Sequence, residues 1–174
     1  MLDVIWDFLG KNAAEIIALC ALFFTTWQFS VQRRHNKVSV LPHLNCYVHR
    51  SEIHNKGKVI VRAINNGLGP AFIKSFTLTL DGDPINFDLL QDARLLFNQV
   101  LGNVRTFKYN ITLLDNDGSL QINDSVDIIV LDIDISSDDS IDKVVHDLKR
   151  IDASLIYRSI YGDEFKLQSL YKYS

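Results

Sequence analysis

Residues 13–31 read AAEIIALCALFFTTWQFSV, and residues 32–37 read QRRHNK. An apolar run that ends in a cationic flank is typical of a helix that crosses a bilayer and meets water at the flank. Trp6 and Trp27 bracket the run, and their separation corresponds to roughly 30 Å of helix, about the thickness of a hydrocarbon core. We therefore expect a spanning helix over residues 13–31, within a membrane anchor formed by residues 1–37.

The charges on either side of the run predict its orientation. Asp3 and Asp7 precede it, whereas Arg33, Arg34 and Lys37 follow it. A cleaved signal peptide has its cations first, so the order here indicates an uncleaved anchor. Under the positive-inside rule the three cations determine the topology, and they favour an outside N-terminus and a cytoplasmic C-terminal domain. The opposite orientation is the alternative.

Composition favours one span attached to one soluble domain. The chain is 47% hydrophobic with a mean hydropathy of +0.05, which is too low for a polytopic membrane protein. Residues 38–174 are numerous enough to bury a single core. The net charge of −3 argues against direct nucleic-acid binding, because neutralising phosphates requires a basic face.

The two cysteines are unsuited to a disulfide within one chain. Cys20 lies in the apolar run and Cys46 lies in the soluble part. This separation suits a reducing cytoplasm, and we interpret both residues as inert thiols.

The soluble part is rich in β-forming residues separated by turn signals. We expect strands at residues 44–50, 59–64, 71–80, 107–114, 125–135, 152–161 and 164–173, with turns at 55–57, 81–84, 115–118 and 162–163. Short helices are expected from Asp88 to Val100, with Gly102 as the stop, and over residues 140–150. The pattern predicts an antiparallel β-sandwich, loosely immunoglobulin-like, with one or two helical insertions. A closed barrel is the alternative.

One expected strand, residues 71–80, carries a specific assignment of faces. Strict alternation puts two sets of side chains on opposite faces, namely Ala71, Ile73, Ser75, Thr77 and Thr79 on one and Phe72, Phe76, Leu78 and Leu80 on the other.

The soluble part contains no pattern that predicts catalysis, a cofactor or a metal. Gly67-Leu68-Gly69 is followed by Pro70 and a strand, whereas a phosphate-binding loop needs a helix to begin there. Four potential zinc ligands lie close in sequence, namely His43, Cys46, His49 and His54. Alternation along a strand turns Cys46 away from His43 and His49, so these three do not converge on one ion. The acidic stretch lacks calcium-loop spacing and is interpreted as outward or capping carboxylates; it comprises Asp132, Asp134, Asp138, Asp139 and Asp142. We therefore expect a protein that is not an enzyme, with no cofactor and no metal.

The apolar helix carries a stripe of small and polar residues at the period of a helix seam. Its members are Asp7, Lys11, Ala14, Ala18, Ala21, Thr25, Gln28 and Gln32. Ala14, Ala18, Ala21, Thr25 and Gln28 form the candidate association face, since small residues let helices approach closely in lipid. Asp7, Lys11 and Glu15 are candidate functional polar residues. A monomeric anchor whose polar side chains snorkel to the interfaces is the alternative.

Three stretches carry a resemblance to a group of known proteins. They are QRRHNKVSVLP at 32–42, NNGLGPA at 65–71 and IYRSIYGD at 156–163. With them, nearly the whole chain resembles small bacterial inner-membrane proteins that have one N-terminal span and a cytoplasmic β-sandwich-like domain. Some proteins of comparable architecture look like membrane effectors of retron-type antiphage defence systems, which are held inactive until infection is sensed and then damage the membrane.

The resemblance and the stripe together lead to two alternative functions. In the first, the chain is a non-enzymatic effector that perturbs the inner membrane in antiviral defence when its cytoplasmic domain is triggered. In the second, it is a passive anchor or adaptor that holds a protein partner at the membrane through the β domain. The expected partners are the lipid bilayer, further copies of the chain through the helix, and a cytoplasmic protein or trigger.

Overall fold

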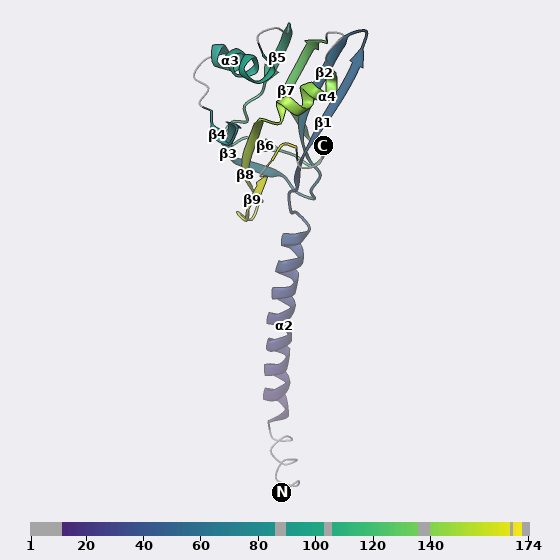
Figure 1. The fold of residues 1–174 in the computed structure, drawn as a ribbon. Coiled ribbons are helices and arrows are strands. Elements are labelled where there is room, and N and C mark those ends of the chain that lie inside the picture. The colour runs from purple at the N-terminus through teal and green to yellow at the C-terminus, as the bar shows by residue number, and fades with distance from the viewer. Residues whose placement is uncertain (1–11, 86–89, 103–105, 136–139, 168, 172–174) are drawn as a thin grey trace. The chain divides into compact units, whose positions relative to one another are not determined.

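The computed structural model describes residues 12–85, 90–102, 106–135, 140–167 and 169–171. The chain divides into two compact units, one ending at Ser39 and the other beginning at Val40. Among the described residues, the first unit contains a single long helix, and the second contains two antiparallel sheets and two short helices (Figure 1). This confirms the expected combination of a long apolar helix and a mainly β domain.

Helix α2 runs from Ala13 to Val38 and continues through the cationic flank. The flank extends the helix because its long polar side chains are compatible with helical backbone and pair across one turn, as in the 3.1 Å hydrogen bond from Gln32 Nε2 to Asn36 Oδ1. The helix ends where the Ser39 N–H donates to the His35 carbonyl at 3.0 Å. The apolar run therefore makes up only the first part of a longer helix.

The strands form two sheets in which every pairing is antiparallel. The first sheet has the order β1-β2-β7-β5, with bounds β1 Leu44–Ile53, β2 Lys56–Asn65, β7 Ser125–Asp134 and β5 Phe107–Ile111. The second has the order β4-β3-β8-β9, with bounds β4 Asp83–Pro84, β3 Ala71–Leu80, β8 Ile151–Arg158 and β9 Glu164–Leu167, and β6 (Ser119–Leu120) pairs with β3. The helices are α3 (Leu90–Leu101) and α4 (Ile141–Leu148).

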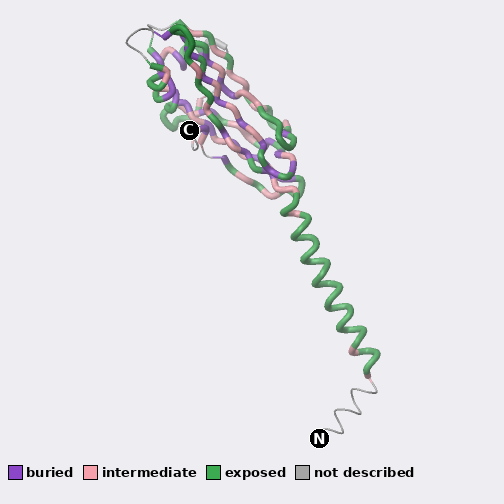
Figure 2. The backbone as a smooth tube through the Cα atoms, turned by 90° about the vertical axis from the view of Figure 1, so that its right-hand side faces the viewer, coloured by how far each residue is buried: buried purple, intermediate pink, exposed green. Residues whose placement is uncertain are grey.

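The core of the second unit takes side chains from both sheets and both short helices. Val61 of the first sheet and Leu155 of the second are among its fully buried members, and burial alternates along the strands in Figure 2. Phe97 of α3 is also fully buried, with its ring centroid 5.1 Å from that of Tyr109 on β5. The Leu44 N–H donates to Tyr157 Oη at 3.3 Å, which links β1 of one sheet to β8 of the other.

The face assignment for residues 71–80 is wrong in its second half. The register of β3 against β8 shifts between Ile73 and Ser75, which marks a bulge. Because an extra residue moves every later side chain to the opposite face, Ile73 and Leu78 are both buried although strict alternation separates them. The bulge keeps both ends of the strand in the core.

Several element bounds differ from the expected ones because turns begin earlier in the chain. The β1–β2 turn uses His54 and Asn55, with φ of 50° and 61°, so β2 already starts at Lys56. β8 stops at Arg158 because Ser159 begins the turn to β9. The short strand β4 lies within the predicted turn at 81–84, and β6 lies where the sequence predicts no element. The proposed helix cap Asp88 lies outside the described residues.

Candidate functional site: the apolar helix and the loop end of the β domain

Helix α2 is long and apolar enough to span a membrane, and among the described residues it is the one helix that meets this test. None of its residues is buried within the structure, as the green tube in Figure 2 shows. A water-soluble protein rarely exposes so much contiguous apolar surface. The helix therefore needs a surrounding that covers it.

The structure places the described part of the predicted stripe on continuous helix. Ala14, Ala18, Ala21, Thr25 and Gln28 all fall within α2 and are exposed, so their spacing puts them on one face. Asp7 and Lys11 lie outside the described residues.

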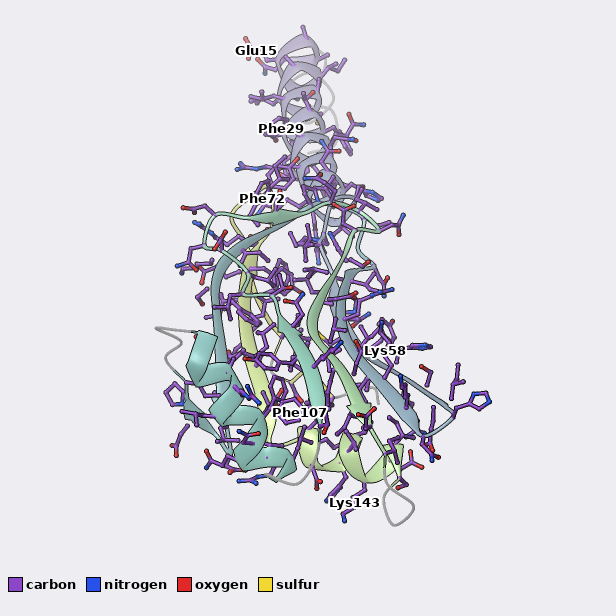
Figure 3. The ribbon with its side chains drawn as sticks, turned by 90° about the horizontal axis from the view of Figure 1, so that it is seen from above. Glu15, Phe29, Lys58, Phe72, Phe107 and Lys143 are labelled. Carbon is purple, nitrogen blue, oxygen red and sulfur yellow. The ribbon has the colours of Figure 1, made fainter. Side chains whose placement is uncertain are left out.

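The remaining helical candidates lie at the two ends of α2. Glu15 is in the first turn, where its negative charge is favoured by the helix dipole, and Figure 3 shows its side chain directed away from the helix. The topology-determining residues Arg33, Arg34 and Lys37 lie in the last part of the helix, and Lys37 is the least exposed of the three.

The hydroxyl groups of α2 already have partners within the helix. Thr25 Oγ1 donates to the Ala21 carbonyl at 2.7 Å, and Thr26 Oγ1 and Ser30 Oγ make equivalent bonds one turn back. These bonds remove most of the cost of placing a hydroxyl in lipid. Gln28, in contrast, has no hydrogen bond among the described residues, so it is the member of the stripe that gains most from an external partner.

In the β domain, the Asn65 side chain organises the stretch where the chain enters β1. Asn65 is fully buried, and its Oδ1 accepts from the backbone N–H groups of His43 at 3.2 Å and Gly67 at 3.0 Å. Its Nδ2 donates to the carbonyls of Gly69 at 2.8 Å and Leu120 at 3.0 Å. Every hydrogen-bonding position of this amide is thus used structurally, and none is left for a ligand.

The two glycines after Asn65 let the chain approach this loop closely. A Cβ on Gly67 would lie 2.3 Å from the His43 nitrogen, and one on Gly69 would lie 2.0 Å from the Val40 oxygen. The glycines are therefore needed because backbone packs against backbone here. Gly67 and Gly69 therefore serve the structure of this turn through close backbone approach and not through a positive φ. The Leu68 N–H completes the turn with a 2.8 Å bond to the Leu41 carbonyl.

The end of the first sheet that carries the β1–β2 hairpin has a hollow of about 420 Å³, lined by side chains of both charges. Its charged lining comprises Lys56, Lys58, Lys108, Asp132 and Asp134. Lys58 Nζ lies 3.8 Å from Asp132 Oδ1, and both side chains are about half exposed. Alternating charges of this kind suit contact with another charged surface.

The four residues considered as zinc ligands do not converge. Cys46 is buried in the core, whereas His43 and His49 are exposed. Burial and the nearby Asp152 carboxylate raise the pKa of the Cys46 thiol to about 12, so it stays protonated at neutral pH. Within the described part of the chain, no three His, Cys, Asp or Glu side chains come together as a metal site. Both cysteines are free thiols.

The loops of the β domain carry a set of exposed apolar side chains that the sequence patterns do not predict. Leu68, Ile122, Ile160 and Tyr161 are all large, exposed and located in turns or loops. The signal was present in the sequence, since two of the quoted stretches, NNGLGPA and IYRSIYGD, contain apolar residues at turn positions where polar residues are usual.

Comparison of the chain with protein-family models, with curated proteins and with solved structures gives no match.

Proposed function

We propose that the chain is a single-pass protein of the bacterial inner membrane, anchored by α2, with the β domain in the cytoplasm as a non-enzymatic binding module. The observation that carries this proposal is the apolar surface of α2, which is long enough to span a bilayer and has no buried residue. The order of acidic residues before the helix and Arg33, Arg34 and Lys37 in its last part supports the cytoplasmic side for the domain.

We further propose that the β domain is an immunoglobulin-like sandwich. The sheet orders β1-β2-β7-β5 and β4-β3-β8-β9 correspond to the A-B-E-D and C′-C-F-G orders of that fold. A core shared by both sheets supports the same assignment. Antibody variable domains of this architecture bind their ligands through loops at one end of the sandwich, and the charged hollow and the loop ends of this domain suit a binding role as well.

We propose that binding of a trigger to the β domain leads to perturbation of the membrane in antiviral defence. Binding of a trigger to the β domain would change the association of α2 helices through Ala14, Ala18, Ala21 and Gln28, and so open a leak. Support comes from the resemblance to effectors of antiphage systems and from Gln28, whose amide has no partner within its own helix.

Membrane potential provides the test of this output. Overexpression of the full chain in bacteria carrying a potential-sensitive dye is expected to depolarise the cells without a trigger, because a high density of α2 helices favours their association. Gln28→Leu is expected to weaken the depolarisation. Ser30→Ala is the matched control, because Ser30 lies on the opposite face and its hydroxyl is bonded within the helix. A normal potential at high expression, or an equal effect of both substitutions, would contradict the effector proposal.

A passive adaptor is the second candidate, and the mixed-charge hollow favours it. Lys56, Lys108 and Asp134 line this hollow next to β5, the edge strand of the first sheet, where a partner strand or a charged loop could bind. This function predicts an unchanged membrane potential in the same experiment. Depolarisation that depends on Gln28 would show that a passive adaptor function does not account for the activity of the chain.

A further inference from the structure

One end of the β domain presents large apolar side chains to solvent. Leu68 is 64% exposed, Ile160 is 61% exposed and Tyr161 is 49% exposed. Ile122 and Phe72 are further exposed apolar residues in the same region. Single exposed apolar residues are ordinary, but a cluster on neighbouring loops marks an interaction surface.

The strand register shows that these residues share one end of the domain. Leu44 at the start of β1 pairs with Asn65 at the end of β2, so residues 40–43 and the loop carrying Leu68 lie together. Phe72 at the start of β3 pairs with Arg158 at the end of β8, which brings the loop with Ile160 and Tyr161 to the same end. Figure 3 shows Phe72 at the opposite end of the sheets from Phe107 and Lys143.

The loops that carry these side chains are held by hydrogen bonds. In the β8–β9 loop, Ser159 Oγ accepts from the N–H groups of Tyr161 and Asp163, both at 3.2 Å, and the Gly162 N–H donates to the Ser159 carbonyl at 2.9 Å. In the β2–β3 loop, Asn65 and the two glycines fix the backbone around Leu68. Ser159, Asn65 and the glycines each have a structural role in these loops. The side chains of Leu68 and Ile160, in contrast, are exposed to solvent and are not part of the hydrophobic core.

The covalent link between α2 and the β domain is short at this end of the domain. Helix α2 ends at Val38, and Val40 already packs against Gly69 in the loop that carries Leu68. Only Ser39 lies between them. The six residues 32–37 span about 9 Å of helix, slightly more than the roughly 5–7.5 Å of one headgroup layer. If α2 spans the bilayer, as the proposed function requires, the loop end therefore starts at the outer edge of the headgroups.

We propose that this loop end docks on the surface of the same bilayer, with Leu68, Ile160 and Tyr161 inserted between the headgroups. A tyrosine suits this position because its ring is apolar and its hydroxyl stays in water. Charges of both signs lie at this end, since Arg158 lines the same hollow as Asp117 and Ile160, so we expect the attraction to come from apolar burial. Docking should accordingly depend little on the content of anionic lipid.

Site-specific fluorescence in the full chain tests the docking. An environment-sensitive label is attached to Leu68→Cys or Ile160→Cys in a Cys20→Ser background, and the buried Cys46 is left in place. The protein is reconstituted in phosphatidylcholine vesicles, with and without phosphatidylglycerol, and the emission is quenched with a lipid that carries a headgroup-level spin label. We expect blue-shifted emission and several-fold stronger quenching at these positions than at the control, Ile53→Cys. Ile53 is 66% exposed and lies at the opposite end, in the β1–β2 hairpin.

The outcomes separate the docking from the anchoring on which it rests. A chain that fails to float with the vesicles contradicts the proposed anchoring and the docking with it. A chain that floats but shows equal quenching at Leu68, Ile160 and Ile53 contradicts the docking alone. A blue shift that disappears when the protein is diluted in lipid would assign the surface to contact between copies of the chain and would also contradict the docking.

Discussion

Asn65 holds together the stretch through which the chain enters the β domain. Asn65→Ala removes the oxygen that accepts from two backbone N–H groups and the nitrogen that donates to two backbone carbonyls. Buried backbone groups then lose their hydrogen-bond partners. We expect a loss of about 3 kcal/mol in the free energy of unfolding, since each unpaired buried group costs roughly 1–3 kcal/mol. Urea unfolding of the full chain in detergent, followed by circular dichroism, measures it.

The neighbouring asparagine provides the control for that measurement. Asn66 is exposed, and its Nδ2 donates to Tyr47 Oη at 3.0 Å. Asn66→Ala should change stability by less than about 0.5 kcal/mol, as is usual for an exposed position. Equal urea midpoints for the two variants would contradict the role assigned to Asn65.

Gly69 and Gly82 require glycine for different reasons: Gly69 because backbone packs closely against it, and Gly82 because its φ is positive. Gly69→Ala places a Cβ 2.0 Å from the Val40 oxygen, so backbone must move, and we expect a cost of about 2 kcal/mol or more. Gly82→Ala meets open space but has φ of 97°, so the cost should be about 1 kcal/mol. Urea unfolding of both variants gives the order, and a larger loss for Gly82→Ala would show that the contact with Val40 is not tight. Increased proteolysis near Val40 should accompany Gly69→Ala only.

Between strands β2 and β7, the pair of Arg62 and Asp127 predicts a small dependence of stability on pH. The hydrogen bond from Arg62 lowers the pKa of the Asp127 carboxyl below its usual value, and Arg62 Nη2 lies 3.1 Å from Asp127 Oδ2. A lowered folded-state pKa stabilises the fold above the unfolded pKa of about 4, and this contribution is lost as the pH falls through the folded pKa. The two side chains are 43% and 35% exposed, so it should be under about 1 kcal/mol.

Comparing unfolding at pH 7 and pH 3 measures this contribution. Asp127→Asn should destabilise the domain at pH 7, and the difference from the original chain should shrink at pH 3. Asp132→Asn, which removes the longer 3.8 Å pair with Lys58, is the control with a smaller expected effect. A difference for Asp127→Asn that stays constant with pH would contradict the ion-pair explanation.

For helix α2, the stripe predicts self-association in a bilayer. Ala18→Leu combined with Ala21→Leu should weaken association by enlarging the proposed contact face, because close approach requires small residues. Cys20→Leu enlarges a side chain on the opposite face, beside the edge-to-face pair of Phe23 and Trp27 at 6.0 Å, and should have little effect. Energy transfer between labelled chains in vesicles is the measurement. Unchanged transfer in the double variant would exclude the seam.

The elements differ in how much of them the sequence could predict. The long helix and the turn-separated strands follow from hydropathy and turn chemistry, which act locally. The bulge at Ile73 to Ser75 was missed because it depends on pairing with β8, more than eighty residues later in the chain. The roles of Asn65 and Gly69 were likewise only partly predictable, because a buried amide and a close backbone approach depend on where residues 40–43 fold back.

The candidate site was predictable to a different degree in each unit. The stripe on α2 follows from its period, but the bonds from Thr25, Thr26 and Ser30 to their own helix were overlooked, and they leave Gln28 as the distinctive residue. The exposed Leu68 and Ile160 needed the strand register before they could be seen at one end of the domain.

At the scale of the whole molecule, the account depends on α2 as a true membrane span. The most direct test is alkaline carbonate extraction of membranes that contain the full chain, followed by flotation of the pellet. The chain should remain in the membrane, and a variant with Leu19→Arg and Leu22→Arg should be released, since each central arginine costs about 3 kcal/mol in lipid. Release of the unmodified chain at alkaline pH would contradict the proposed anchoring and every function built on it.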